Sequence, residues 1–185
     1  MRPSKLLKKL LKRNRYDIGV EVGPNSTVSR DSWIGAYSYV GRNCVIGKTT
    51  VGRYVSIADN VSIGNGEHDI TRISTSSMFY QNPYEELTKG DCVIESDVWI
   101  GVDAIVRRGV TLGFGCVIGA NSFVNRDVPA FAIAAGSPAR IIGYRFDEAV
   151  RQEILDSKWW EMIPTEAAAT IAKLKSRSIG KATEN

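Results

Sequence analysis

The fold is decided by residues 94–124, IESDVWIGVDAIVRRGVTLGFGCVIGANSFV. In this stretch an aliphatic residue stands at every sixth position: Ile94, Ile100, Val106, Leu112, Ile118 and Val124. A period of six matches neither the roughly 3.6-residue turn of an α-helix nor the longer spacing of hairpin turns in a β-meander. It indicates a prism of short flat strands, in which each six residues form one side of a triangular coil.

The same period is present upstream, with one slip. Its aliphatic positions are Val22, Val28, Ile34, Val40, Ile46, Val51, Ile57 and Ile63, and only the step from Ile46 to Val51 is five. We expect these side chains to point inward and to stack on their equivalents about 4.8 Å above and below. Burying each is worth roughly 1.5–3 kcal/mol, so the fourteen together form an adequate core without help from helices. The fold predicted is an all-β solenoid, a parallel β-helix.

Small residues accompany the aliphatic positions. Glycine often follows an aliphatic residue directly, as in Ile34-Gly35, and a small or β-branched residue usually stands four places after it, as at Cys44 and Cys116. We expect this second set to share the crowded interior of the prism. Glycine, Asn or Asp at the corners supplies the positive φ angles that a tight corner needs.

The repeat divides the chain into three parts: a basic N-terminal helix or cap at residues 1–20, the β-helix at 21–145, and a C-terminal helical segment with a tail at 146–185. The period fails between Ile63 and Ile94, where residues 65–92 are polar, aromatic and proline-containing. We expect them to form an extruded loop, a kind of segment that is usually functional or disordered in a compact domain. Its aromatic residues argue against disorder.

Two helices are predicted after the prism. The first runs from near Asp147 to about Trp160, and Pro164 acts as a breaker. The second runs from Thr165 to about Lys175, and we expect the remaining residues to be frayed.

Charge and cysteine content exclude several classes of protein. The chain has 24 basic and 20 acidic residues, but seven of the basic residues lie within residues 1–15, so the remainder is slightly acidic and no nucleic-acid partner is expected. Three cysteines without CxxC spacing suggest neither disulfides nor a metal cluster, and no apolar run is long enough to span a membrane. We expect a cytoplasmic protein without a metal.

The N-terminal segment SKLLKKLLKR, residues 4–13, places its leucines on one helical face with lysines around them. The first interpretation is a helix that caps the open first coil, as repeat folds require. The alternative is a weak contact with an anionic membrane surface.

The chain contains one histidine, His68, and it lies in the predicted loop. An imidazole, whose unperturbed pKa is about 6.5, is the side chain best suited to act as a general base near neutral pH. The alternative is a merely exposed histidine. A cysteine nucleophile is disfavoured because Cys44 and Cys116 occupy interior positions of the repeat.

Three blocks of sequence carry a family resemblance: GDCVIESDVWIG (residues 90–101), DVPAFAIAAGSPAR (127–140) and the RF…KWW ending (145–160). Together they resemble the xenobiotic-acetyltransferase branch of the hexapeptide-repeat family over about residues 20–162. That branch includes chloramphenicol and streptogramin acetyltransferases and many sugar O-acetyltransferases of surface-polysaccharide clusters. The resemblance implies a left-handed β-helix and a homotrimer that binds acetyl-CoA between neighbouring prisms.

The resemblance also implies roles for particular residues. His68 inherits the role of general base. Trp99 would flank the cofactor arm, and backbone groups around Ala104, Ser122, Ala134, Ala135 and Gly136 would accept its amides. Arg126, Arg140 and Arg145 would meet the adenosine phosphates, with solvated surface charge as the alternative for each. The substrate-facing loop residues would be Asn65, Glu67, Asp69, Phe79 and Tyr80.

The acceptor is inferred from the loop sequence HDITRISTSSMFYQNPY, residues 68–84. It is closer in style to the polysaccharide-cluster enzymes than to the antibiotic-modifying ones, so the expected acceptor is a sugar hydroxyl of a surface polysaccharide or its precursor. Alternatives are O-acetylation of an antibiotic, N-acetylation of an amino sugar and a non-catalytic scaffold. A metal enzyme of the γ-carbonic anhydrase type would need several histidine ligands, which a single histidine per chain does not supply.

Overall fold

The structure, a computed structural model, describes residues 15–182, with side chains as far as residue 176. The expected N-terminal cap and the alternative membrane contact of residues 4–13 lie outside the described residues. Over the described range, no helix is both long and apolar enough to cross a membrane.

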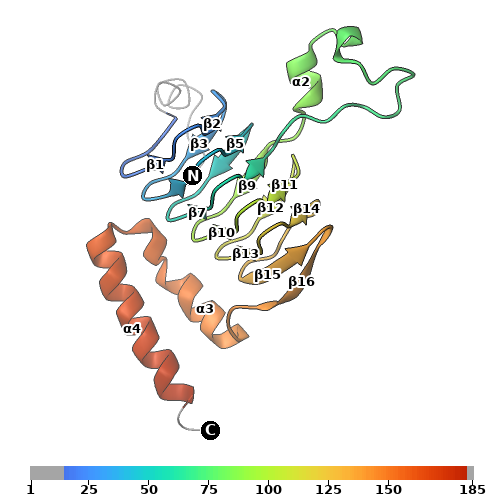
Figure 1. Cartoon of the computed structure of the whole chain (residues 1–185). Coiled ribbons are helices and arrows are strands. Elements are labelled where there is room, and N and C mark those ends of the chain that lie inside the picture. Colours follow the sequence, from blue (N-terminus) through green and yellow to red (C-terminus); the bar gives the residue numbers. More distant parts are fainter. Residues whose placement is uncertain (1–14, 183–185) are drawn as a thin grey trace.

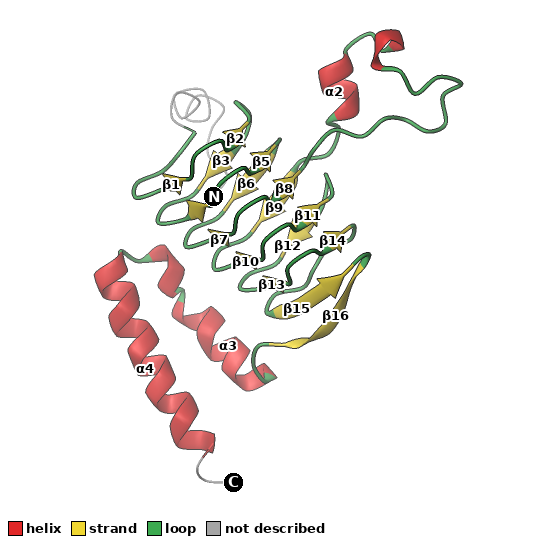
Figure 2. Cartoon of the chain, viewed as in Figure 1, coloured by secondary structure: helices red, strands yellow, loops and turns green. Residues whose placement is uncertain are grey.

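Short parallel strands wind into a three-sided prism (Figure 1 and Figure 2). The first face holds β1 (Glu21–Val22), β4 (Tyr39–Val40), β7 (Ser56–Ile57), β10 (Trp99–Ile100), β13 (Val117–Ile118), β15 (Ala132–Gly136) and β16 (Ala139–Tyr144). The second holds β2 (Thr27–Val28), β5 (Val45–Ile46), β8 (Ser62–Ile63), β11 (Ile105–Val106) and β14 (Phe123–Val124). The third holds β3 (Trp33–Ile34), β6 (Thr49–Val51), β9 (Cys92–Ile94) and β12 (Thr111–Leu112). The predicted parallel β-solenoid is therefore confirmed.

The aliphatic residues of the repeat form the core. Thirteen of the fourteen are buried, and Val22 packs partly buried against them. They stack in register: Ile100 pairs with Ile57 on one side and with Ile118 on the other. Most of the small interior residues are buried as well, because each side of the narrow prism contributes one aliphatic and one small inward side chain. At the five-residue step Thr49 takes the inward place and Thr50 faces out.

Two of the three edges of the prism differ in the residues that turn the corner. Between the first and second faces, the positive φ angles belong to Asn25, Asn43, Asn60, Asp103 and Asn121, as expected for polar corner residues. Between the third and first faces, Tyr37, Tyr54 and Phe131 adopt φ angles of 60°, 58° and 61°, while Asp97 and Gly115 turn the two corners between Tyr54 and Phe131. Left-handed backbone is unfavourable for bulky residues, and this feature was not predicted. We call this second edge the aromatic edge.

Aromatic stacking offsets the cost of those corners. The rings of Tyr37 and Tyr54 are 5.1 Å apart, and Tyr54 lies 5.2 Å from the ring of Trp159 in the C-terminal segment. The Tyr54 hydroxyl also donates to the carbonyl of Met162 at 2.9 Å. The aromatic edge thus serves as the platform on which the C-terminal segment packs.

The end of the prism and the C-terminal segment differ from the prediction in three places. β15 and β16 form an unpredicted antiparallel hairpin that closes the first face. α3 (Glu148–Ser157) begins after its N-cap Asp147 but ends before Trp160, because Lys158 turns the backbone to a φ of 48°; a short 3-10 turn, η2 (Trp159–Glu161), follows. α4 (Pro164–Ala182) continues past Lys175, and Pro164 opens it instead of breaking the chain, since a first helical residue needs no N–H donor.

The boundaries of the loop and of the prism also shift. Tyr16 already forms a parallel bridge with Ile34, so the first coil starts before residue 21. Cys92 belongs to β9, so the loop ends one residue earlier than expected. It runs from residue 64 to 91, and we call this segment the arm.

Replacing Ile100 by Ala should lower the free energy of unfolding by about 2–5 kcal/mol, because the side chain is fully buried between two stacked isoleucines. Urea unfolding followed by circular dichroism at fixed protein concentration measures the change. Val93→Ala is the matched control on an outward position that is 40% exposed, and it should cost under about 1 kcal/mol. Equal losses in the two variants would contradict the stacked-core description.

Candidate active site

The arm leaves the edge between the second and third faces and projects away from the prism (Figure 1). It contains a 3-10 turn, η1 (Ser77–Phe79), and a short helix, α2 (Pro83–Leu87). Lys48 of the prism pairs with Glu85 of α2 at 2.9 Å, and the Tyr84 hydroxyl donates to Asp31 at 2.8 Å. The arm is therefore attached to the prism at α2 as well as at its two ends.

His68 is exposed on the arm, and its ring is oriented by a backbone group. Its Nδ1 lies 2.5 Å from the carbonyl oxygen of Thr75. A carbonyl can only accept a hydrogen bond, so Nδ1 carries a proton, and in the neutral ring the lone pair is then on Nε2. A neutral imidazole in this tautomer is the form that a general base requires.

Tyr80 supports the histidine from the side. Its ring meets the ring of His68 edge-on at 6.1 Å, and the Tyr80 side chain is buried. The Tyr80 hydroxyl accepts a hydrogen bond from the Asp69 N–H at 2.8 Å, and the guanidinium of Arg72 lies 4.1 Å above the Tyr80 ring. Arg72 in turn pairs with Glu86 at 2.6 Å. These contacts give the arm a small core of its own next to His68.

The other loop residues expected at the substrate divide into two groups. Asp69 accepts hydrogen bonds from the N–H and hydroxyl of Thr71, and Glu67 turns toward the prism, so neither carboxylate is free. Asn65 is exposed and Phe79 is 64% exposed. Three further apolar side chains of the arm that the sequence analysis did not single out are also exposed: Ile70, Ile73 and Met78.

Some of the expected cofactor residues lie together at the last coil. Arg126, Ala134 and Arg140 line one groove of about 260 Å³. The Gly136 N–H donates to the Ser122 hydroxyl beside it, and Ala135 pairs with Arg140 across the hairpin. The groove lies close to the edge from which the arm departs. One of its lining residues, Val124, pairs with Val106 of the preceding coil, so the groove lies one coil beyond Val106.

The remaining cofactor residues are more constrained. The carbonyls of Ala104, Ser122 and Ala134 already accept N–H bonds from the adjacent coil, so each offers a ligand only its second lone pair. The Ala104 side chain is fully buried, whereas Trp99 is 54% exposed on the outer side of the first face.

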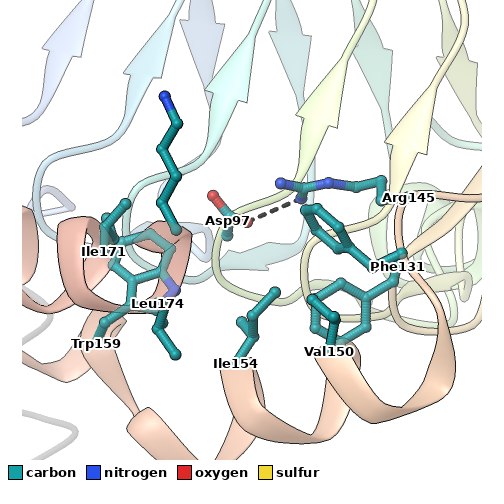
Figure 3. Close-up of a pocket in the computed structure, with 10 residues that line it drawn as sticks. Asp97, Phe131, Arg145, Val150, Ile154, Trp159, Ile171 and Leu174 are labelled. Carbon is teal, nitrogen blue, oxygen red and sulfur yellow. Dashed lines mark hydrogen bonds and ion pairs between the residues drawn. The ribbon is translucent and has the colours of Figure 1, made fainter. Parts of the chain in front are cut away.

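Arg145 lies away from Arg126 and Arg140. It points into a cavity of about 540 Å³ between the aromatic edge and helices α3 and α4 (Figure 3). There its Nη1 pairs with Asp97 at 2.9 Å and donates to the Gly115 carbonyl at 2.7 Å. Burial raises the pKa of Asp97 although the Arg145 guanidinium opposes that shift. The structure thus places Arg145 in an ion pair on another edge.

The cysteines are unavailable for nucleophilic chemistry. Cys44, Cys92 and Cys116 are all buried and unpaired. Burial raises the pKa of Cys116 to about 12, and it raises the pKa of the other two thiols as well. Among residues 15–182, no group of three or more His, Cys, Asp and Glu side chains is placed to hold a metal ion.

Known proteins of similar sequence are acetyltransferases of the hexapeptide type. A family described as bacterial transferase hexapeptide (six repeats) matches residues 91–126. Chloramphenicol acetyltransferase from Escherichia coli is 32% identical over 161 residues, 75% of this chain and 76% of that protein. A chloramphenicol acetyltransferase from Agrobacterium fabrum is 37% identical over 124 residues, 61% of this chain and 59% of that protein. The galactoside O-acetyltransferase of Escherichia coli K12 is 30% identical over 127 residues, 63% of each chain.

Solved structures show the same fold. A hexapeptide-repeat containing acetyltransferase from Vibrio cholerae superposes with a TM-score of 0.60 at 26% identity, covering 80% of this chain and 84% of that one. A second structure of that protein, solved in complex with acetyl-CoA, has a TM-score of 0.57 at 24% identity and covers 80% and 81%. The chain belongs to the hexapeptide-repeat family. Within that family it is an acetyltransferase.

Because the reactive form of cysteine is the thiolate, the three thiols should resist alkylation in the folded protein. Iodoacetamide at neutral pH should leave acetyl transfer unchanged, while the same reagent in concentrated urea should modify all three cysteines, as counted by mass spectrometry. Loss of activity in step with alkylation of the native protein would contradict their assignment to the core.

Proposed function

We propose that the enzyme transfers an acetyl group from acetyl-CoA to a hydroxyl group, with His68 as the general base. The observation that carries the proposal is the hydrogen bond between His68 Nδ1 and the Thr75 carbonyl, which in the neutral ring places the lone pair on Nε2. The donor is supported by the Vibrio cholerae relative that was solved with acetyl-CoA.

In the reaction His68 first accepts one proton and then gives it up again. Nε2 of His68 takes the proton of the acceptor hydroxyl while that oxygen attacks the thioester carbonyl. The carbon–sulfur bond then breaks, and the imidazolium returns the proton to the departing thiolate, giving the acetyl ester and free coenzyme A. No acyl-enzyme is formed, in keeping with the buried cysteines.

The donor site is proposed at the groove of the last coil. Guanidinium groups bind phosphate in a forked geometry, and Arg126 and Arg140 both line this groove. Trp99 and the backbone of Ala135 and Gly136 remain proposed contacts for the pantetheine arm. Arg145 supports this site least, because its guanidinium is engaged by Asp97 and Gly115 on another edge.

Two classes of acceptor hydroxyl remain in competition. A sugar hydroxyl of a surface polysaccharide or its precursor is supported by the loop sequence and by the similarity to a galactoside O-acetyltransferase. A chloramphenicol-type hydroxyl is supported by the longer alignment with the enzyme named for that antibiotic, and by the exposed apolar side chains near His68. Both acceptors use the same proton transfer at His68.

We also propose a homotrimer with the active site between protomers. The arm projects away from the prism, and the second face presents outward-facing Val45 and Ile105 at 42% and 47% exposure. A neighbouring prism packed against these residues would bury them and bring the arm beside a donor groove.

His68→Ala should lower kcat by about 10²–10⁴-fold, the usual contribution of a general base, while acetyl-CoA binding persists. Thiol release from acetyl-CoA, measured with chloramphenicol, a macrolide, a galactoside and a polysaccharide precursor, provides the assay and ranks the acceptors. Binding of acetyl-CoA is checked by thermal shift. Full turnover in the variant, or no turnover of any hydroxyl acceptor by the wild type, would rule out the proposal.

Multi-angle light scattering should give three times the 20.3 kDa mass of one chain. Val45→Glu on the second face should shift the population toward monomer and reduce kcat, because the site would lose one of its walls. Wild-type protein that runs as a monomer with full activity would contradict a shared site.

A further inference from the structure

The two segments of the arm meet at its stem, immediately before the proposed base. The Glu67 N–H donates to the Leu87 carbonyl at 2.8 Å. This hydrogen bond joins the segment that leaves the prism to the segment that returns to it. A Cβ atom at Gly66 would lie 3.3 Å from the Leu87 Cβ, so the two segments are in close contact there. His68 is the first residue beyond this junction.

The side chain of Glu67 ties the stem to the prism. Its two carboxylate oxygens each accept a hydrogen bond of 2.7 Å from Arg107, one from Nε and one from Nη2. Arg107 is held in turn, because its N–H donates to the Val124 carbonyl of the next coil at 2.8 Å. Forked pairs of this kind fix orientation as well as distance.

A second arginine holds the segment of the arm that returns to the prism. The guanidinium of Arg108 donates to the carbonyl of Lys89, and its Nε lies 3.5 Å from Oε2 of Glu67. Both segments of the stem are therefore bound by neighbouring residues of one prism corner, Arg107 and Arg108. Hydrogen bonds from Arg107 lower the pKa of Glu67, which keeps the carboxylate ionised at neutral pH.

We propose that Glu67 is a positioning residue, which through Arg107 holds the arm so that His68 presents Nε2 at the acetyl-transfer site. The proposal rests on the proposed function of His68. It replaces the expected contact of Glu67 with substrate, because both carboxylate oxygens are already bound by Arg107.

The other attachment of the arm acts on His68 less directly. Tyr84 and Glu85 fix α2 to the prism, and α2 reaches the stem through the hydrogen bond from the Glu67 N–H to the Leu87 carbonyl. Glu67 itself is the residue next to His68 in the chain. The Glu67 side chain is 33% exposed, so the ion pair adds little to global stability. Its main consequence is the orientation of the stem.

Asp59 provides a matched control elsewhere on the prism. It binds Arg42 through Nε at 2.9 Å and Nη2 at 2.7 Å, and its side chain is 34% exposed. Both of these bonds end on Oδ2, so the pair is not forked over two oxygens as the Glu67–Arg107 pair is, but the two carboxylates are similarly exposed. The Asp59–Arg42 pair lies at the edge between the first and second faces. Asp59→Asn therefore removes a comparable ion pair without touching the arm.

Glu67→Gln and Arg107→Lys should each lower kcat by about tenfold or more, because small displacements of a catalytic group are costly. The KM for acetyl-CoA and the melting temperature should change no more than in Asp59→Asn, whose kcat should stay at the wild-type value. Combining Glu67→Arg with Arg107→Glu should recover part of the lost kcat. The pH at which activity is half-maximal should stay unchanged.

The outcomes separate this proposal from the one on which it rests. Full activity in His68→Ala would remove the proposed function itself. An inactive His68→Ala together with wild-type kcat in both Glu67→Gln and Arg107→Lys would overturn the positioning role alone. A shifted pH profile with an unchanged maximal rate would also overturn it, since Glu67 would then act on proton affinity instead of geometry.

Discussion

Stacking of equivalent aliphatic side chains from coil to coil is the interaction on which the rest of the molecule depends. Most strands are two residues long, so a single strand makes few hydrogen bonds. It is ordered only by its neighbours in the coils above and below. The column that contains Ile57, Ile100 and Ile118 shows how one inward residue per side maintains the register. Every corner, groove and attachment point is positioned by that register.

The three edges of the prism have separate uses. One carries an exposed ladder of polar corners, in which Asn43 donates to Asn60 at 3.1 Å and Asn60 donates to Asp103 at 2.9 Å. The aromatic edge receives the C-terminal segment through Tyr54 and Trp159. The third releases the arm and adjoins the groove of the last coil. This separation keeps the proposed catalytic parts away from the contacts that fasten the helices.

The sequence predicted the features that repeat and missed those that depend on distant partners. The six-residue period identifies the buried columns, and its failure after Ile63 places His68 on a loop. No local pattern marks the Glu67–Arg107 pair, because its members are 40 residues apart. The sequence also did not separate Arg145 from Arg126, since only the folded hairpin decides which edge an arginine faces. The left-handed tyrosines were missed because the ring of Tyr54 packs on Trp159, far along the chain, and Tyr37 in turn packs on Tyr54.

The arm is inserted without disturbing the register of the coils. Val51 pairs with Ile94 and Ile63 with Val106, in the same way as residues one coil apart pair elsewhere. Mutations within the arm therefore leave the stacked columns intact and do not change the packing of the core. In evolutionary terms the scaffold and the arm, which we propose faces the acceptor, form two modules, so new substrate ranges can be selected on a prism whose stability is already secured.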